Sequence, residues 1–229
     1  MRPHHGVHAL RGVRRVNLPD GLTVVYEDRH IVVVDKPSGL LSVPGKGEAN
    51  QDCVVSRVKA LHPESIDQPS VHRLDQDTSG LLVLALTEAA HRTLSMQFMD
   101  KLVGKRYIAL LDGVVELDAG VIELSFRLDP DNRPYQVYDP ERGKSGTTRW
   151  RKLGVENGRT RVEFMPLTGR THQLRLHASH PKGLGVPIVG DRLYGTGTGP
   201  GQLKLHAWTL RFRHPETRKP MEFTSPPPF

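Results

Sequence analysis

HRLDQDTSGLLVLAL, residues 72–86, places a polar cluster directly before the longest purely apolar stretch of the chain, residues 81–86. The apolar stretch has no polar alternation, which predicts a strand that is buried on both faces. A buried strand is a rigid support, so residues at its start can be aimed into a site. Asp75 and Asp77 could form a general acid–base pair, or they could equally form Asx turns. The stretch predicts the centre of a sheet with a candidate site beside it.

Upstream of this strand, the sequence predicts a β-hairpin and a helix. Residues 22–27 and 31–34 are rich in β-branched side chains, and residues 28–30 form the turn between them. Gly and Pro then impose an irregular loop, which ends at Asp52. We expect Asp52 to cap a helix that runs to about Leu61.

Downstream, Thr87 is expected to cap a second helix, whose apolar stripe recurs every four residues at Ala90, Leu94, Phe98 and Leu102. The rest of the chain is richer in strands, predicted at residues 107–111, 121–126, 147–152, 160–164 and 203–212. No shift in composition divides the chain. The pattern therefore predicts a single mixed α+β domain, built on a largely antiparallel sheet with flanking helices.

The composition limits the classes of partner and compartment. The chain has 229 residues and a net charge of +7, so a polyanionic partner is plausible. Its apolar stretches fall far short of the roughly 20 residues that span a membrane. The single cysteine, Cys53, excludes an intrachain disulfide and suits a reducing compartment, and it is expected to be a small core residue. We expect a cytoplasmic protein.

Two further stretches contain more special residues than a scaffold needs. In the loop of residues 35–45, ordinary turn geometry explains the Gly and Pro residues, and Lys36 could be a solvated charge. Residues 168–180 are ambiguous between helix and strand. Within them Arg170 could pair with a carboxylate, and Arg175 could contact phosphate.

Three histidines in the same stretch raise the alternative of a metal site, at His172, His177 and His180. Spacings of five and three lack the i, i+4 pair that places two ligands on one helical face, and no carboxylate lies among them. We therefore expect histidines that pack or donate hydrogen bonds, and no metal.

Five motifs, taken in order, resemble those of the RluA-type pseudouridine synthases. Residues 36–39 resemble the KPxG loop of that family, and residues 72–80 resemble its central HRLDxxTSG motif. Later segments resemble its KxY, GRTHQLR and LHA motifs, at residues 105–107, 169–175 and 205–207. The resemblance runs from about Leu22 to Phe223. Finer similarities to the subgroup that acts on both ribosomal and transfer RNA lie at residues 40–45, 132–134 and 190–194.

The resemblance implies an isomerase with a central active-site cleft, which needs no cofactor and no metal. The uracil N1–C1′ bond is broken, the base rotates, and a C5–C1′ bond forms. Asp75 would be the essential carboxylate, and Arg170 would pair with it. Tyr107 would stack on the target base, and its hydroxyl would serve in removal of the C5 proton.

Base flipping is also implied, because a base inside a stem or folded loop cannot reach Asp75. Arg73 would fill the vacated stack, and Leu205 would pack on the other side of the base. The remaining residues expected to bind substrate are Lys36, His72 and Arg175. The implied partner is structured ribosomal or transfer RNA, with no membrane and no obligate protein partner, and we expect a monomer.

The resemblance also predicts the domain organisation. Residues 20–223 would form the catalytic domain, between a basic tail of residues 1–19 and an extended tail of residues 224–229. Only about twenty residues precede the first strand, so the N-terminal S4 RNA-binding domain of many family members is not expected. Two alternatives stay open: an idle RNA-binding or folding module that uses the same basic groove, and a metal-dependent hydrolase.

Overall fold

The computed structural model describes residues 16–18 and 21–229, and most of the predicted basic tail of residues 1–19 lies outside them. The first half of the described chain contains β1 (Val16–Asn17), β2 (Thr23–Glu27), β3 (Ile31–Lys36), η2 (Glu48–Asn50), α1 (Val54–Leu61), β4 (Ser79–Ala85) and α2 (Glu88–Met99). The second half contains β5 (Gly104–Leu111), β6 (Ala119–Leu128), β7 (Gln136–Tyr138), β8 (Lys144–Glu156), β9 (Arg159–Pro166), α3 (Gln173–Ser179), β10 (Leu205–Arg213) and β11 (Pro220–Thr224).

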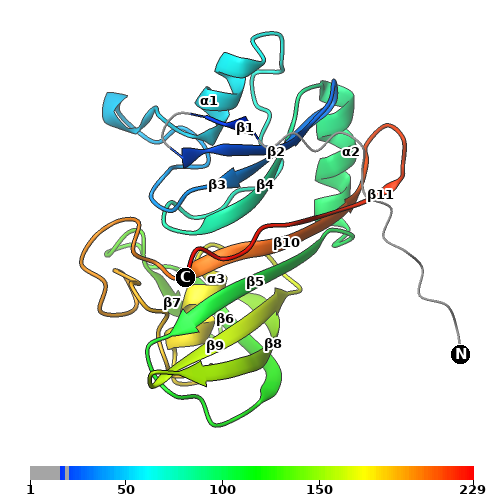
Figure 1. Ribbon diagram of the computed structural model, residues 1–229. Helices are drawn as coiled ribbons and strands as arrows, with labels where there is room; N and C mark the ends of the chain where they lie inside the picture. Colours follow the sequence, from blue (N-terminus) through cyan, green and yellow to red (C-terminus); the bar gives the residue numbers. More distant parts are fainter. Residues whose placement is uncertain (1–15, 19–20) are drawn as a thin grey trace, which may run out of the picture.

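In the described part of the molecule, eleven strands form one sheet (Figure 1). Their order is β1-β2-β3-β4-β10-β5-β9-β8-β6-β7, and β11 pairs with β10. Neighbouring strands are antiparallel except for β4 and β10, which are parallel. The prediction of an α+β fold on a largely antiparallel sheet is confirmed.

The junction between β4 and β10 is short. They pair only where His206 and Ala207 face Ser79 and Gly80, at the start of both strands. Beyond this point the two strands diverge, and β11 takes over the edge of β10 from Thr209 onward. The free edge of β4 is covered instead by residues 69–72, which bond to its backbone. A cleft can therefore open at the middle of the sheet without leaving backbone groups unpaired.

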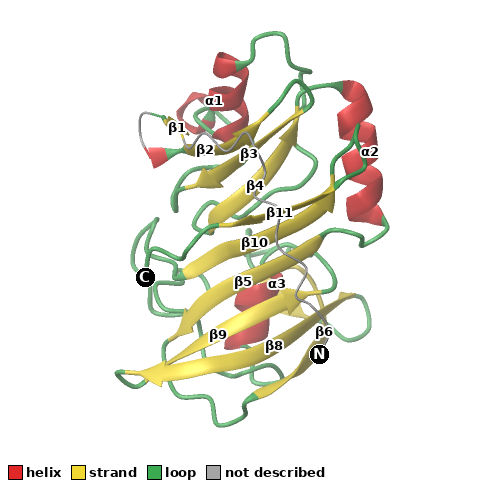
Figure 2. Cartoon of the chain, turned by 45° about the vertical axis from the view of Figure 1, so that its right-hand side comes forward, coloured by secondary structure: helices red, strands yellow, loops and turns green. Residues whose placement is uncertain are grey.

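The first half is a three-layer sandwich, with α1 and α2 on opposite faces of the sheet (Figure 2). Alternate residues of β3 and β4 supply the two cores. Val32, Val34, Leu82 and Leu84 face α1, whereas Ile31, Val33, Leu81 and Val83 face α2. Every residue of β4 is buried, as the apolar run of residues 81–86 predicted. Burial of each such side chain contributes roughly 1.5–3 kcal/mol, which makes β4 a rigid support.

In the second half, α3 lies against one face of the sheet formed by β5, β9, β8 and β6 (Figure 1). Its core joins Leu174, Leu176 and Ala178 of the helix to side chains such as Phe126, Trp150 and Phe164. Tyr107 packs against this core and also against the α1 core of the first half, so it lies between the two halves. No helix among the described residues is long and apolar enough to cross a membrane.

Both predicted helices exist, but their ends differ from the expectation. Cys53, and not Asp52, caps α1: its buried thiol accepts the Ser56 N–H, and Asp52 pairs with Arg57 at 2.7 Å. Cys53 is a core residue as predicted. Thr87 caps α2 as predicted, but the helix ends at Met99, so Leu102 lies beyond it and is 67% exposed.

The C-terminal segment is more ordered than its composition suggested. Thr224 belongs to β11, the N–H of the buried Ser225 donates to Trp208 O, and the Ser225 hydroxyl donates to the Asp35 carboxylate. Phe229 lies against Arg161 and Lys204. Residues 225–229 form no helix or strand, but the segment packs against the rest of the chain, and Thr224, expected in the tail, belongs to β11.

Gly80 at the β4–β10 junction offers a test of how tightly the two halves are joined. It has a φ of +109°, and a Cβ there would lie 2.4 Å from Ala207 O. We expect Gly80→Ala to lower the free energy of unfolding by roughly 3 kcal/mol, as measured by urea denaturation. Gly158→Ala is the control, because φ is +73° but no atom lies within 4 Å of its Cβ. That change should cost about 1 kcal/mol of backbone strain, and equal losses in the two variants would contradict the tight junction.

Candidate active site

A cleft of about 1080 Å³ opens between the two halves, at the start of β4 where the polar cluster of residues 72–80 lies. Its lining comes from the turn before β4, the end of α2, the start of β5, the segment from the end of β9 into α3, and β10. Among the described residues that line it, Asp75 is the one carboxylate, against seven cations: Arg73, Lys101, Lys105, Arg106, Arg170, Arg175 and Arg211. Such a lining attracts polyanions and leaves one acid exposed to them.

Asp75 lies on a turn that the loop of residues 36–42 holds in place. The Ser42 hydroxyl donates to Leu74 O at 2.7 Å and accepts the Leu74 N–H at 3.1 Å. Gly39 N–H donates to Gln76 O at 2.9 Å. Two loops far apart in sequence thus position one carboxylate, whose side chain is 24% exposed.

Lys36 corrects an expectation, because it is fully buried and cannot bind substrate. Its Nζ donates to the carbonyl oxygens of Pro37, Leu40 and Gln76 at 2.7–3.0 Å. Burial lowers the pKa of Lys36 to about 7, against the opposing effect of the nearby Asp77 and Asp75 charges. Lys36 therefore joins the two loops and does not act as a solvated charge.

Asp77 has a structural role. The residue is 4% exposed, and its carboxylate accepts from Arg192 Nε at 2.9 Å and accepts the Gly201 N–H at 3.0 Å. Asp75 and Asp77 face different surroundings, so they do not form an acid–base pair.

Arg175 is the cation beside Asp75. Its guanidinium is 3% exposed and donates two hydrogen bonds to Asp191, at 2.8 and 2.6 Å, while its Nη1 lies 3.9 Å from Asp75 Oδ2. Burial alone would raise the pKa of Asp191, but the Arg175 guanidinium and two backbone N–H donors hold that pKa below its usual range. A phosphate contact of Arg175, as expected from the sequence, would have to compete with Asp191 for the guanidinium.

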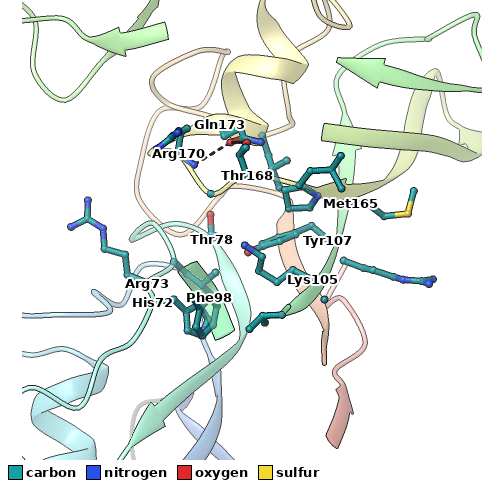
Figure 3. Close-up of a pocket in the computed structure, with 18 of the residues that line it drawn as sticks. His72, Arg73, Thr78, Phe98, Lys105, Tyr107, Met165, Thr168, Arg170 and Gln173 are labelled. Carbon is teal, nitrogen blue, oxygen red and sulfur yellow. Dashed lines mark hydrogen bonds between the residues drawn. The ribbon is translucent and has the colours of Figure 1, made fainter. Parts of the chain in front are cut away.

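Arg170 does not make the predicted ion pair with Asp75. Its side chain is exposed, its Nε donates to Ser145 O at 3.4 Å, and its backbone N–H donates to Gln173 Oε1 at 3.1 Å. Figure 3 shows its side chain directed away from Tyr107. The physical reason is that α3 begins at Gln173, so Arg170 stays in the loop at the rim while Arg175 faces inward from the helix.

Tyr107 and Leu205 are two apolar-faced residues of the cleft lining. They come from the adjacent strands β5 and β10, and both line the cleft, as predicted. Burial raises the pKa of the Tyr107 phenol above its usual range, and the charge of Asp75 raises it further. The phenol therefore stays neutral at physiological pH.

His72 and Arg73 line the cleft but differ in exposure. His72 Nε2 accepts the Val83 N–H at 3.1 Å, and its ring stacks on Phe98 with centroids 4.4 Å apart. Burial lowers the pKa of His72 to about 3, with a smaller effect from the Lys105 charge. Its acceptor atom is thus used within the protein, whereas Arg73 is exposed at the mouth of the cleft (Figure 3).

The three histidines of residues 168–180 lie in separate environments. His172 Nδ1 is 2.9 Å from Tyr194 Oη, His177 packs edge-on against Phe126, and His180 lies against Tyr138. Among residues 16–18 and 21–229, no group of three His, Cys, Asp or Glu side chains could hold a metal ion.

Two residues that complete the site were not predicted to take part in it. Asp191 holds Arg175 through the two bonds described above, and the Tyr194 ring lies 5.3 Å from the Arg175 guanidinium. Tyr194 Oη also accepts the Gln136 N–H at 2.8 Å. The sequence signal was an arginine between two leucines in a buried helix, which requires a partner, but spacing alone does not identify that partner.

Comparisons with known proteins identify the family of the chain. Residues 30–180 match the family model described as RNA pseudouridylate synthase. The chain is 44% identical over 206 residues to the dual-specificity RNA pseudouridine synthase RluA of Yersinia pestis, covering 88% of this chain and 97% of that protein. The protein of the same name from Escherichia coli K12 is 40% identical over 224 residues, covering 95% and 100%.

Solved structures show the same fold. The human RNA pseudouridylate synthase domain containing 1 superposes with a TM-score of 0.72 at 29% identity, covering 94% of this chain and 87% of that one. The human domain containing 4 gives 0.70 at 24% identity, covering 90% and 88%.

The neutral state of His72 predicts a pH dependence of stability. The folded pKa of about 3 lies below the ordinary value of 6.5, so between these values the folded state binds fewer protons than the unfolded state. Stability should therefore fall as the pH drops below about 6.5, by up to about 1.4 kcal/mol per pH unit. His72→Gln keeps an acceptor for Val83 but does not titrate, so its stability should fall less steeply. Urea unfolding at about pH 7 and about pH 5 measures the two slopes, and parallel slopes would contradict the assignment.

Proposed function

Because the chain belongs to the RNA pseudouridylate synthase family, as its ordered motifs predicted, we propose that it isomerises uridine to pseudouridine in RNA. The relatives are named RNA pseudouridine synthases and match over nearly their full length. This supports an isomerase over an idle binding module. The observation that carries the proposal is the single carboxylate of the cleft, Asp75, held beside a buried guanidinium.

Asp75 is the residue for the chemical step. The reaction breaks the N1–C1′ bond and forms a C5–C1′ bond; a proton leaves C5 and a proton is gained at N1, so no cofactor is consumed. Asp75 attacks the ribose or the base, or assists cleavage of the glycosidic bond. At 3.9 Å and an effective dielectric near 20, the Arg175 charge interacts with that carboxylate by about 4 kcal/mol. Because Arg175 is fixed by Asp191, it needs no reorganisation during the reaction.

Tyr107 and Leu205 hold the target base. The Tyr107 ring lies between the two cores and beside Asp75, so a flipped uracil can stack on it. Base–aromatic stacking contributes roughly 1–3 kcal/mol, which offsets part of the cost of flipping. The raised pKa of the Tyr107 phenol favours stacking as its main role, because a neutral phenol is a weak proton acceptor.

Arg73 fills the space that the flipped base leaves. It is exposed at the mouth of the cleft, two residues from Asp75, so its guanidinium can reach the helical stack. We infer structured ribosomal or transfer RNA as the substrate, from the similarity to the dual-specificity relatives, and a cytoplasmic monomer as the working form. Mapping pseudouridines in total RNA from cells with and without the protein would identify the target uridine.

Asp75→Asn tests the chemical role. We expect it to abolish C5-hydrogen release from uridine-labelled RNA while RNA affinity stays within about tenfold, because one carboxylate contributes little to phosphate binding. Asp67→Asn, at a fully exposed carboxylate, is the control and should keep full activity. Retained turnover in Asp75→Asn would reject the mechanism. A wild-type protein that binds RNA but releases no hydrogen would support the idle module instead.

Arg175→Gln and Arg170→Gln, compared in parallel, test which arginine supports Asp75. Arg175→Gln should lower kcat at least about 100-fold and the free energy of unfolding by roughly 3 kcal/mol, because Asp191 loses its partner. Arg170→Gln should keep kcat within about threefold and mainly weaken binding. Steady-state kinetics and urea unfolding measure both variants, and the reverse order of kcat losses would restore the original prediction for Arg170.

A further inference from the structure

Lys105 is a cleft residue to which the mechanism above gives no task. It precedes Tyr107 by two residues on β5, and its Nζ lies 6.0 Å from the centroid of the Phe98 ring. The same atom lies 3.5 Å from the point where a Cβ on Gly169 would stand. Figure 3 shows Lys105 and Tyr107 in the same cleft. The side chain therefore spans the cleft between α2 and the loop before α3.

Nothing in the described protein neutralises this ammonium group. Lys105 makes no hydrogen bond or ion pair within residues 16–18 and 21–229, although its neighbours Arg106 and Arg175 are both paired with carboxylates. Burial lowers the pKa of Lys105, because the ammonium group loses hydration there. A partly desolvated cation without a counter-ion is costly, and an anion in the cleft would remove that cost.

The strand geometry indicates which anion this is. Residues i and i+2 of a strand point to the same face and lie about 6.6 Å apart, so Lys105 is one step along β5 from the ring of Tyr107. On the proposed function, that ring carries the flipped uracil. Of the groups of that nucleotide, the sugar–phosphate backbone is the one that carries a negative charge. An uncharged uracil carbonyl would not balance the ammonium charge, whereas a phosphodiester brings a full negative charge.

We propose that Lys105 binds a phosphate adjoining the flipped uridine and so anchors the backbone of the extruded nucleotide. This inference rests on the proposed function and adds to it a binding residue separate from the chemistry. Further cations of the lining lie at Lys101, Arg106 and Arg211, of which Arg106 and Arg211 are also paired with Glu163 and Glu222. The RNA backbone thus has a charged path out of the cleft.

The first test is the salt dependence of binding to a hairpin RNA with one loop uridine, followed by fluorescence anisotropy. Lys105→Met should weaken affinity about tenfold and reduce the slope of log K against log salt by about 0.7, the contribution of one phosphate in single-stranded RNA. Lys105→Arg should keep the slope. Lys219→Met, the same change at an exposed lysine outside the cleft, should leave both unchanged. An unchanged slope in Lys105→Met would overturn the proposal, as would a lower melting temperature without a change in slope.

The second test identifies the phosphate. Methylphosphonate replaces, in turn, the phosphodiester on each side of the uridine in the same hairpin. At one of the two positions, the methylphosphonate should weaken RNA binding by the wild-type protein. It should not weaken binding by Lys105→Met any further, because that variant already lacks the contact. Additive losses at both positions would contradict the contact. Both tests measure RNA binding and not turnover. If the wild-type protein binds RNA but releases no C5 hydrogen, the proposed function is rejected, while the binding data still show whether Lys105 contacts a phosphate.

Discussion

The site depends on a buried guanidinium that has to be shared by two carboxylates. Arg175 comes from α3 in the second half of the molecule, Asp191 from the loop that follows, and Asp75 from the turn before β4 in the first half. Removing either the cation or its main partner would leave a buried charge unpaired, which typically costs 3–5 kcal/mol. The short β4–β10 junction and this ion-pair group act together: the first joins the halves through backbone, and the second fixes their facing surfaces. The cleft is therefore a consequence of how the halves are joined.

Most of the fold was predictable because local pattern and tertiary burial agree. β-branched runs, an unbroken apolar run and a four-residue stripe correspond to β2, β3, β4 and α2. The elements that were missed have weak local signals. β7 is three residues long, and β11 begins at a proline. Each therefore depends on backbone pairing with the edge of a neighbouring strand, which local sequence does not reveal. The cap of α1 was predicted one residue too early, at Asp52. In the structure the buried Cys53 thiol accepts the Ser56 N–H and caps the helix instead.

The sequence predicted which residues lie in the site better than it predicted which of them contact each other. Asp75, Tyr107 and Leu205 line the cleft as expected, whereas Arg175 and not Arg170 lies beside Asp75, and Lys36, expected to bind substrate, is buried. The direction of a side chain depends on where a helix begins. Residues 168–180 were ambiguous between helix and strand, and His172 before α3 adopts a left-handed backbone with a φ of 55°. No pattern in the sequence specifies that conformation, so the face on which each arginine lies could not be derived.

The cations of the cleft divide into two sets by what already holds them. Arg175 is enclosed by Asp191 and Asp75, so a phosphate could displace neither partner without exposing a buried charge. Within the described residues, Lys105, Arg73 and Arg170 have no carboxylate partner, and Arg73 and Arg170 are exposed at the rim. On the proposed function, RNA can therefore bind to the second set without disturbing the first. In a cleft with seven equivalent cations, the RNA backbone could equally bind the guanidinium beside the proposed catalytic carboxylate. The internal pairing of Arg175 prevents this, and it allows substrate affinity and the chemical step to depend on different residues.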